Sequence, residues 1–132
     1  VEGFSAALDR AEAYVEAGAD VLFVEAPQNR AQLEEIGTRF AGRIPLLANM
    51  VEGGATPITD ADDLERQGFS IVIFPGGIVR AIGRTAQDYY KSLHANGSNK
   101  PFANRMFNFD GLNDVIGTRE QLEIGARYDA KD

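Results

Sequence analysis

Cysteine is absent from the 132-residue sequence, which excludes disulfides, thiolate metal sites and a cysteine nucleophile within it. Long apolar runs are absent too, so no segment has the length of a membrane span. Neither a Walker pattern nor GxGxxG occurs, and His, Asp and Glu do not recur at the spacing of a metal site. The absence of cysteine is consistent with a reducing compartment, and we expect a cytoplasmic protein. A targeting segment upstream of Val1 is left open.

Positive charge is in the minority. Lys and Arg number 13 against 20 Asp and Glu, so the net charge is −7. An acidic chain is repelled by nucleic-acid backbones and anionic lipid surfaces, and we expect neither as a partner. The hydrophobic fraction of 44% and the charged fraction of 25% are ordinary for one globular domain with a core.

Apolar runs at residues 20–25, 44–49 and 69–74 predict three strands that are buried on both faces, as in a parallel sheet. Helices are predicted before, between and after them, because apolar residues recur there every three or four positions. The predicted strand tips, Glu25, Asn49 and Phe74, lie 24 and 25 residues apart. This interval is typical of successive β/α units. Predicted helix caps are Asn29 with Gln32, Thr59 with Asp62, Asp110, and Thr118 with Gln121.

Three parallel strands cannot close a barrel, and an eight-unit barrel needs roughly 250 residues. The sequence also opens on a helix. We therefore predict the C-terminal half of a (β/α)8 barrel, with residues 1–96 forming its last β/α units. Residues 97–132 are predicted to form a helical tail without strands. An open sheet of the flavodoxin type is the alternative, although such a sheet normally begins with a strand.

Three residues at or near the predicted strand ends could do chemistry. Glu25 ends an apolar strand, where its carboxylate either pairs at the rim or faces a ligand at the carboxyl end of the sheet. Asn49 also ends a strand and either binds an oxyanion or caps the loop that contains Gly53 and Gly54. Arg80, in the first turn of a long helix, has a bidentate guanidinium that suits a carboxylate ligand. A purely structural role is disfavoured, because a cation in the first turn opposes the helix dipole.

Two charged residues near these candidates limit the functional interpretation. Arg84 lies one turn after Arg80, so both arginines could belong to an ordinary helix surface. Glu52 follows the predicted strand and precedes a glycine, and we expect it to be exposed rather than catalytic.

The motifs around these residues resemble the isocitrate lyase/phosphoenolpyruvate mutase superfamily. The resemblance covers nearly the whole sequence from Gly3 to about Leu93 and continues around Leu112 and Asn113. Its most specific part is the combination at residues 47–57. The segments that carry it are Phe23-Val24-Glu25-Ala26-Pro27, Leu47-Ala48-Asn49-Met50-Val51-Glu52-Gly53-Gly54 with Thr56-Pro57, Ile73-Phe74-Pro75 and Arg80.

The resemblance implies a (β/α)8 barrel that uses Mg²⁺, with Mn²⁺ as an alternative. It implies that Glu25 contributes to the metal and substrate environment as a catalytic residue, without ligating the metal directly. Asn49, the backbone of Met50 and Val51, and Arg80 would bind the substrate. Direct metal ligands and the general base would lie on strands that this sequence does not contain.

The function implied is carbon–carbon bond cleavage in a small 2-hydroxy or 2-keto di- or tricarboxylate through a metal-stabilised enolate. Within the superfamily, the alternative is the P–C chemistry of a phosphonomutase or phosphonopyruvate hydrolase. Outside enzymes, the alternative is a non-catalytic, anion-binding αβ module. The resemblance also implies a homo-oligomer, expected to be a tetramer, in which the tail packs on a neighbouring subunit.

One departure from the family pattern concerns the substrate. In 2-methylisocitrate lyases an arginine of the C-terminal segment helps to hold the additional carboxylate of a tricarboxylate. The register of the resemblance places Phe109 at that position, with Arg105 four residues earlier. A dicarboxylate of the dimethylmalate or oxaloacetate kind is therefore on an equal footing with 2-methylisocitrate.

Overall fold

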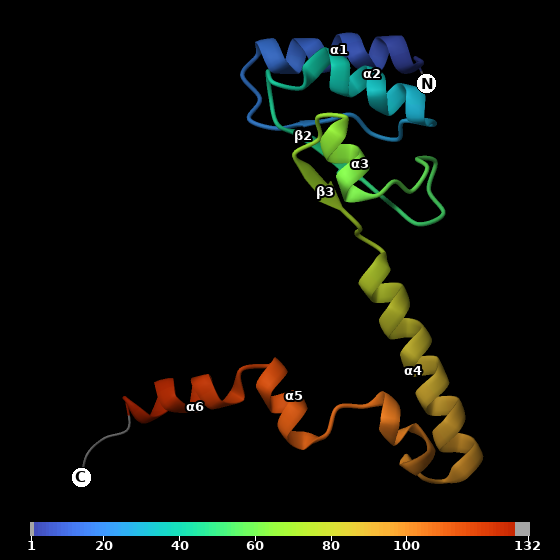
Figure 1. Cartoon of the computed structure of the whole chain (residues 1–132), viewed down its shortest axis with the longest axis vertical. Coiled ribbons are helices and arrows are strands. Elements are labelled where there is room, and N and C mark those ends of the chain that lie inside the picture. The colour runs from blue at the N-terminus through green and yellow to red at the C-terminus, as the bar shows by residue number, and fades with distance from the viewer. Residues whose placement is uncertain (1, 129–132) are drawn as a thin grey trace. The chain divides into compact units, whose positions relative to one another are not determined.

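The computed structural model describes residues 2–128, and the chain divides into two compact units between Ala81 and Ile82 (Figure 1). The first unit alternates helices and strands. Its elements are α1 (Phe4–Glu16), β1 (Leu22–Phe23), α2 (Arg30–Phe40), β2 (Leu46–Asn49), α3 (Ala61–Arg66), β3 (Ile71–Ile73) and the start of α4 (Gly77–Asn96).

The three strands form one parallel sheet in the order β1-β2-β3. Leu22 pairs with Leu46, and Leu47 pairs with Ile71, so equivalent positions recur every 24 residues. The prediction of three adjacent parallel strands is confirmed, although each strand is shorter than its apolar run. Ile73, rather than the predicted Phe74, is level with Asn49. The predicted interval of 25 residues between Asn49 and Phe74 is therefore one residue too long, and Phe74 belongs to the turn after β3.

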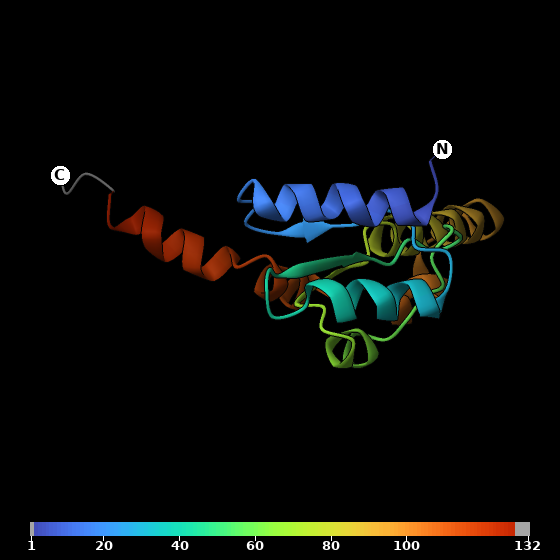
Figure 2. The same cartoon turned by 90° about the horizontal axis from the view of Figure 1, so that it is seen from above.

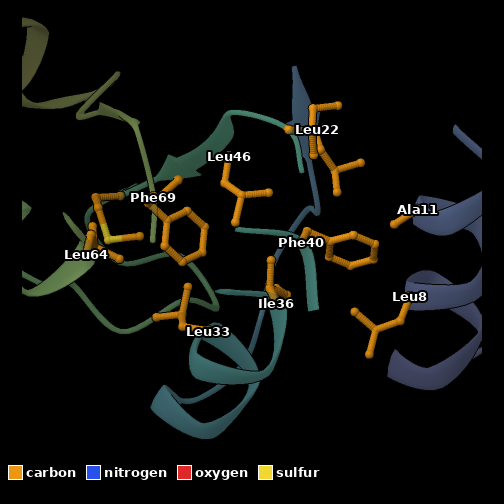
Figure 3. Close-up of a cluster of buried hydrophobic side chains, with 12 residues drawn as sticks. Leu8, Ala11, Leu22, Leu33, Ile36, Phe40, Leu46, Leu64 and Phe69 are labelled. Carbon is orange, nitrogen blue, oxygen red and sulfur yellow. The ribbon is translucent and has the colours of Figure 1, made fainter. Parts of the chain in front are cut away.

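The core lies on the face of the sheet that the helices cover. Successive residues of a strand point to opposite faces, and in β2 it is Leu46 and Ala48 that are buried. The helices α1 and α2 lie next to the sheet (Figure 2), and their apolar side chains meet those of the strands. Figure 3 shows labelled members of this cluster. They are Leu8, Ala11, Leu22, Leu33, Ile36, Phe40, Leu46, Leu64 and Phe69.

The opposite face of the sheet is apolar but more open. Phe23, Ile71 and Ile73 are 44%, 37% and 39% exposed, and Leu47 between them is half-buried. Phe23, Leu47 and Ile71 form one row across the three strands. In a closed (β/α)8 barrel this face is the packed interior, which is filled by apolar side chains from all the strands.

Ionic contacts join α1 to the end of α2. Arg43 binds the Glu12 carboxylate through two nitrogens, and Arg39 Nε lies 3.4 Å from Glu12 Oε2. The hydrogen bond from Arg43 is the main cause that lowers the pKa of Glu12 below its usual value. The two arginine side chains are 36% and 44% exposed, so these ion pairs orient the two helices more than they stabilise them.

The caps follow the prediction only in part. Asn29 caps α2 as expected, because its Oδ1 accepts a hydrogen bond from the Gln32 N–H at 3.0 Å. At the other three helices, the cap position falls one or two residues before the predicted residue or after it. Asp60, without a side-chain hydrogen bond, precedes α3 in place of Thr59, whose hydroxyl donates to the Pro57 carbonyl. In the tail, Asn108 caps α5 instead of Asp110, and Gly117 precedes α6 in place of Thr118.

Gly37 allows the closest approach between α2 and the segment after α3. A Cβ at this position would lie 1.8 Å from the Gln67 carbonyl oxygen, which belongs to the backbone and cannot rotate away. The residue is buried within α2. An alanine would therefore force the two segments apart.

We predict that Gly37→Ala lowers the free energy of unfolding by about 2 kcal/mol, because overpacking of a close contact moves the backbone. The matched control is Gly83→Ala, since Gly83 also lies inside a helix but has no atom within 4 Å of its added Cβ. Alanine is the better helix former, so Gly83→Ala should raise stability by about 0.5–1 kcal/mol. Thermal unfolding of both variants checks the prediction. Equal midpoints for the two variants would contradict it.

The second unit is entirely helical in its described part. It contains α4 from Ile82 onward, η1 (Lys100–Arg105), α5 (Phe109–Val115) and α6 (Thr118–Ala126). The absence of strands from the tail is thus confirmed for residues 97–128. The first helical element after α4 is the 3-10 helix η1, which begins at Lys100. The predicted domain boundary after Asn96 stays a prediction. The boundary between the two compact units lies inside α4, between Ala81 and Ile82.

Phe102 anchors η1 to α4. Its side chain is buried, and its ring meets that of Tyr89 edge-on at 5.5 Å between centroids. The Arg105 guanidinium lies 4.3 Å from the Phe102 ring centroid, and it also contacts Asp88 at 3.3 Å. These contacts fix the turn from α4 into the tail.

Candidate functional site

Asn49 ends β2 with an amide that has no partner among the described residues. The residue is half-buried, its Oδ1 is buried, and no described residue donates a hydrogen bond to that atom. Buried polar atoms are nearly always hydrogen-bonded, so an unpaired one at a strand end indicates a partner outside the described residues, which can be a ligand or another part of the barrel. The alternative, an amide that caps the following loop, is not observed, because no described loop residue bonds to it.

Glu25 is brought to the same edge of the sheet as Asn49. It lies two residues beyond Phe23, as Asn49 lies two beyond Leu47, and Phe23 pairs with Leu47. Continuing this register places Glu25 and Asn49 in one row on one face. Glu25 is exposed, and no ion pair among the described residues involves it. The structure therefore provides no rim cation for this carboxylate within the described chain.

Glu25 also lines a cavity of about 410 Å³ at the N-terminal end of α1. Arg10 and Gln32 contribute to its wall. The Arg10 guanidinium is already paired with Glu2 at 2.8 Å, so it does not neutralise Glu25.

The turn after Glu25 is strained. Ala26 has φ 56°, the one left-handed backbone among the described non-glycine residues, and buried Pro27 follows it. A left-handed alanine costs about 1–2 kcal/mol, so the surrounding structure must hold it in place. The strain turns the chain sharply at the end of β1 and presents Glu25 at the edge.

The backbone donors predicted at Met50 and Val51 are not equivalent. Met50 is fully buried, and its N–H donates to the Ile73 carbonyl at 2.8 Å, which commits it to the sheet. Val51 accepts from the Gly54 N–H at 3.0 Å, in a turn whose third residue, Gly53, has φ 74°. Among the described hydrogen bonds none is donated by the Val51 N–H. Of these two residues, Val51 is therefore the one whose N–H is left for a ligand.

Arg80 reaches the loop that begins at Asn49. Its Nη1 donates to the Glu52 carbonyl, and the same nitrogen lies 3.6 Å from Glu52 Oε2. The expectation that Glu52 is exposed was wrong, because its side chain is half-buried against the start of α4. The sequence allows this contact but does not single it out. An acid just past one strand end and a base just past the next can meet when the strands are parallel neighbours.

Arg84 belongs to a different contact. Its Nε lies 3.2 Å from the Asp88 carboxylate, one helical turn away. Hydrogen bonds from Arg84 and then Arg105 lower the pKa of Asp88. The structure thus separates the two arginines, because Arg80 contacts the candidate site and Arg84 braces α4.

The described residues do not fit a metal centre by themselves. No group of three or more His, Asp or Glu side chains converges within residues 2–128. In the same part of the chain, no helix combines the length and the apolar character needed to cross a membrane.

Comparisons with known proteins agree with this geometry. A family model described as phosphoenolpyruvate phosphomutase matches residues 1–94. The 2-methylisocitrate lyase of Escherichia coli is 39% identical over 97% of this chain and 39% of its own length. The chloroplastic carboxyvinyl-carboxyphosphonate phosphorylmutase of Arabidopsis thaliana is 37% identical over 96% of this chain and 37% of its own length. A crystal structure of 2,3-dimethylmalate lyase superposes with a TM-score of 0.86 at 29% identity, over 98% of this chain and 42% of that one.

The chain spans about two-fifths of the length of these relatives. The superposition confirms the predicted fold class, three parallel β/α units of a (β/α)8 barrel followed by a helical tail. The relatives are lyases and a mutase, as the resemblance implied. The chain therefore belongs to the isocitrate lyase/phosphoenolpyruvate mutase superfamily.

Proposed function

We propose that this chain supplies part of the active site of a carbon–carbon lyase for small 2-hydroxy or 2-keto carboxylates. The observation that carries the proposal is the buried, unpaired Oδ1 of Asn49 at the carboxyl end of β2, level with Glu25. In (β/α)8 enzymes, catalytic residues lie at the carboxyl ends of the strands. The lyase relatives support carbon–carbon cleavage in particular.

In the proposed site, the substrate carboxylate lies over the end of β2. The Asn49 Nδ2 and the Val51 N–H donate hydrogen bonds to it, Arg80 supplies the positive charge, and the Asn49 Oδ1, which is an acceptor, faces a hydroxyl of the substrate. Hydrogen bonds to a charged group contribute more than those between neutral groups, so three donors suffice to orient a small acid. Glu25 then faces the reacting end of the substrate, where its negative charge adjusts the electrostatics of bond cleavage.

Mg²⁺, or Mn²⁺ in its place, belongs to the proposal only through the superfamily resemblance. The described residues do not form a metal site, so the direct ligands would come from residues outside this sequence. Bound there, the ion would supply a Lewis acid for the developing enolate. No role of the residues described above depends on contact with the metal.

The experiment that tests the function is a substrate panel with the complete enzyme at saturating Mg²⁺. The compounds are oxaloacetate, 2,3-dimethylmalate, 2-methylisocitrate and phosphonopyruvate. We expect turnover of a carbon–carbon substrate, with the dicarboxylates at least equal to 2-methylisocitrate because Phe109 stands where an arginine would hold the third carboxylate. Turnover of phosphonopyruvate alone would favour the P–C alternative, which the phosphorylmutase relative also supports. No turnover of any of the four compounds would contradict the proposal.

We predict that Glu25→Gln lowers kcat about tenfold while KM changes little. The substitution keeps the shape of the side chain but removes its charge, and a charge that acts mainly in the transition state affects kcat. The control is Glu34→Gln, which removes an exposed carboxylate that is ion-paired with Arg30 on α2. Steady-state kinetics on the best substrate of the panel measures both. A kcat of Glu25→Gln equal to that of the control would exclude a catalytic role.

Assembly is the remaining part of the proposal. The tail exposes large apolar side chains, with Phe107, Phe109 and Val115 at 68%, 84% and 67%. Apolar residues in this number are typical of a surface that another subunit covers. A homo-oligomer, as a tetramer, in which the tail packs on a neighbouring subunit is consistent with this exposure.

A further inference from the structure

Glu52 is the acidic group nearest to the candidate site that the proposed mechanism leaves without a role. It lies in the loop after β2, three residues past Asn49, and its carboxylate reaches across to the start of α4. Because β2 and β3 are parallel neighbours, both loops leave the same edge of the sheet. Glu52 therefore links two segments that each contribute a proposed substrate-binding residue.

The contact between Glu52 and Arg80 has two parts. Arg80 Nη1 donates to the main-chain carbonyl of Glu52, and it lies 3.6 Å from Oε2 of the same residue. One nitrogen of the guanidinium is thus hydrogen-bonded to the backbone carbonyl and ion-paired with the carboxylate, whose buried Oε2 accepts no hydrogen bond from the described residues. The Arg80 side chain is still 56% exposed, so its other donors are accessible to a ligand.

The start of α4 is shaped to accept the Glu52 carboxylate. A Cβ at Gly77 would lie 2.9 Å from Glu52 Oε1, and one at Gly76 would lie 3.0 Å from Oε2. A side chain at either position would push the carboxylate, the end of a flexible side chain, away from its observed place. The N-terminal end of a helix also favours a negative charge, and here it offsets the unfavourable position of a cation in the first turn.

We propose that Glu52 is a positioning residue for Arg80. It holds the guanidinium over the edge of the sheet beside Asn49, ready to bind the substrate carboxylate, and this role rests on the proposed function. Preorganisation lowers the entropy cost of fixing a long, flexible side chain when the ligand binds. Glu52 itself does not touch the substrate.

The primary test measures KM and kcat of Glu52→Gln in the complete enzyme. We expect KM to rise about threefold to tenfold while kcat stays within about twofold, because ground-state binding is what Arg80 provides. Glu52→Asp keeps the charge and should recover part of the loss. Glu34→Gln, the exposed ion-paired control, should leave both constants unchanged. A fall in KM for Glu52→Gln would overturn the proposal, because Glu52 would then compete with the substrate for Arg80.

A double-mutant cycle separates positioning from a general structural effect. In an Arg80→Ala background, Glu52→Gln should change KM less than about twofold, since its action passes through Arg80. If Glu52→Gln raises KM by the same factor with and without Arg80, the proposal is overturned. Gly77→Ala, which displaces the carboxylate, should raise KM in the same direction as Glu52→Gln, whereas Gly83→Ala in the same helix should not.

Binding of oxalate by calorimetry makes the test independent of turnover. If the enzyme converts none of the panel but binds oxalate in an Arg80-dependent manner, the proposed function fails and the role of Glu52 is still measured. Glu52→Gln should then weaken oxalate binding about threefold to tenfold. If Arg80→Ala leaves oxalate binding unchanged, or if no oxalate binds, Arg80 holds no carboxylate and the positioning role is overturned.

Discussion

Asn49→Ala should lower kcat/KM about tenfold to 150-fold in the complete enzyme, mainly through a higher KM. The amide has no hydrogen-bond partner among the described residues, so its removal breaks nothing within them. What is lost is a hydrogen bond to a charged substrate group, worth on the order of 1.5–3 kcal/mol. The effect should therefore fall on substrate binding and leave the thermal midpoint nearly unchanged.

Asn29→Ala is the matched control for this prediction. Asn29 caps α2 by accepting from the Gln32 N–H at 3.0 Å, so its removal should reduce stability by about 1 kcal/mol without a change in KM. The two variants are thus expected to differ, with a loss of substrate binding in Asn49→Ala and a loss of stability in Asn29→Ala. Steady-state kinetics and thermal unfolding of both variants give the answer. A stability loss without a kinetic loss in Asn49→Ala would mean that this amide serves the fold.

Phe40→Ala should cost about 3–5 kcal/mol of stability, the largest effect that we expect of any single substitution in this chain. Phe40 is 0% exposed at the end of α2, and it packs in the cluster that joins α1, α2 and the sheet. The guanidinium groups of Arg39 and Arg43 also lie 5.5 and 5.8 Å from its ring centroid. An alanine would leave a cavity and remove both cation–π contacts.

Phe40→Leu keeps most of the buried volume and should cost less than about 1.5 kcal/mol. The difference between the alanine and leucine variants measures the cavity rather than the loss of an aromatic ring alone. Thermal unfolding checks both variants, and kcat at a temperature where both are folded should be unchanged. A midpoint for Phe40→Ala equal to that of Phe40→Leu would show that the helices close the cavity without cost.

Local pattern accounts for the parts of this protein that the sequence alone could predict. The apolar runs around Leu22, Leu46 and Ile71 recur at equal intervals, and this spacing identified the parallel strands and their order. The cap at Asn29 was recognisable because its partner, Gln32, lies three residues away. Glu25 and Asn49 were identified as candidates because a polar residue that ends an apolar run marks the edge of a sheet.

Where several polar residues lie close together, a pattern does not choose among them. Asp60 rather than Thr59, and Asn108 rather than Asp110, precede their helices, because the backbone geometry of the loop decides which residue takes the cap position. The same limit applies to the site. Met50 and Val51 are adjacent and apolar, but the parallel register gives the Met50 N–H to Ile73 and leaves that of Val51 without a described partner.

The sequence by itself determined the β/α repeat and the residues at two of its strand ends, because these depend on periodicities and short-range contacts. Only the tertiary structure decided that Glu52 turns inward to meet Arg80, 28 positions later in the chain. That contact exists because neighbouring parallel strands bring both loops to one edge, and because Gly76 and Gly77 carry no side chain to block the carboxylate. Approach across such a sequence distance depends on the assembled sheet, and no local pattern records it.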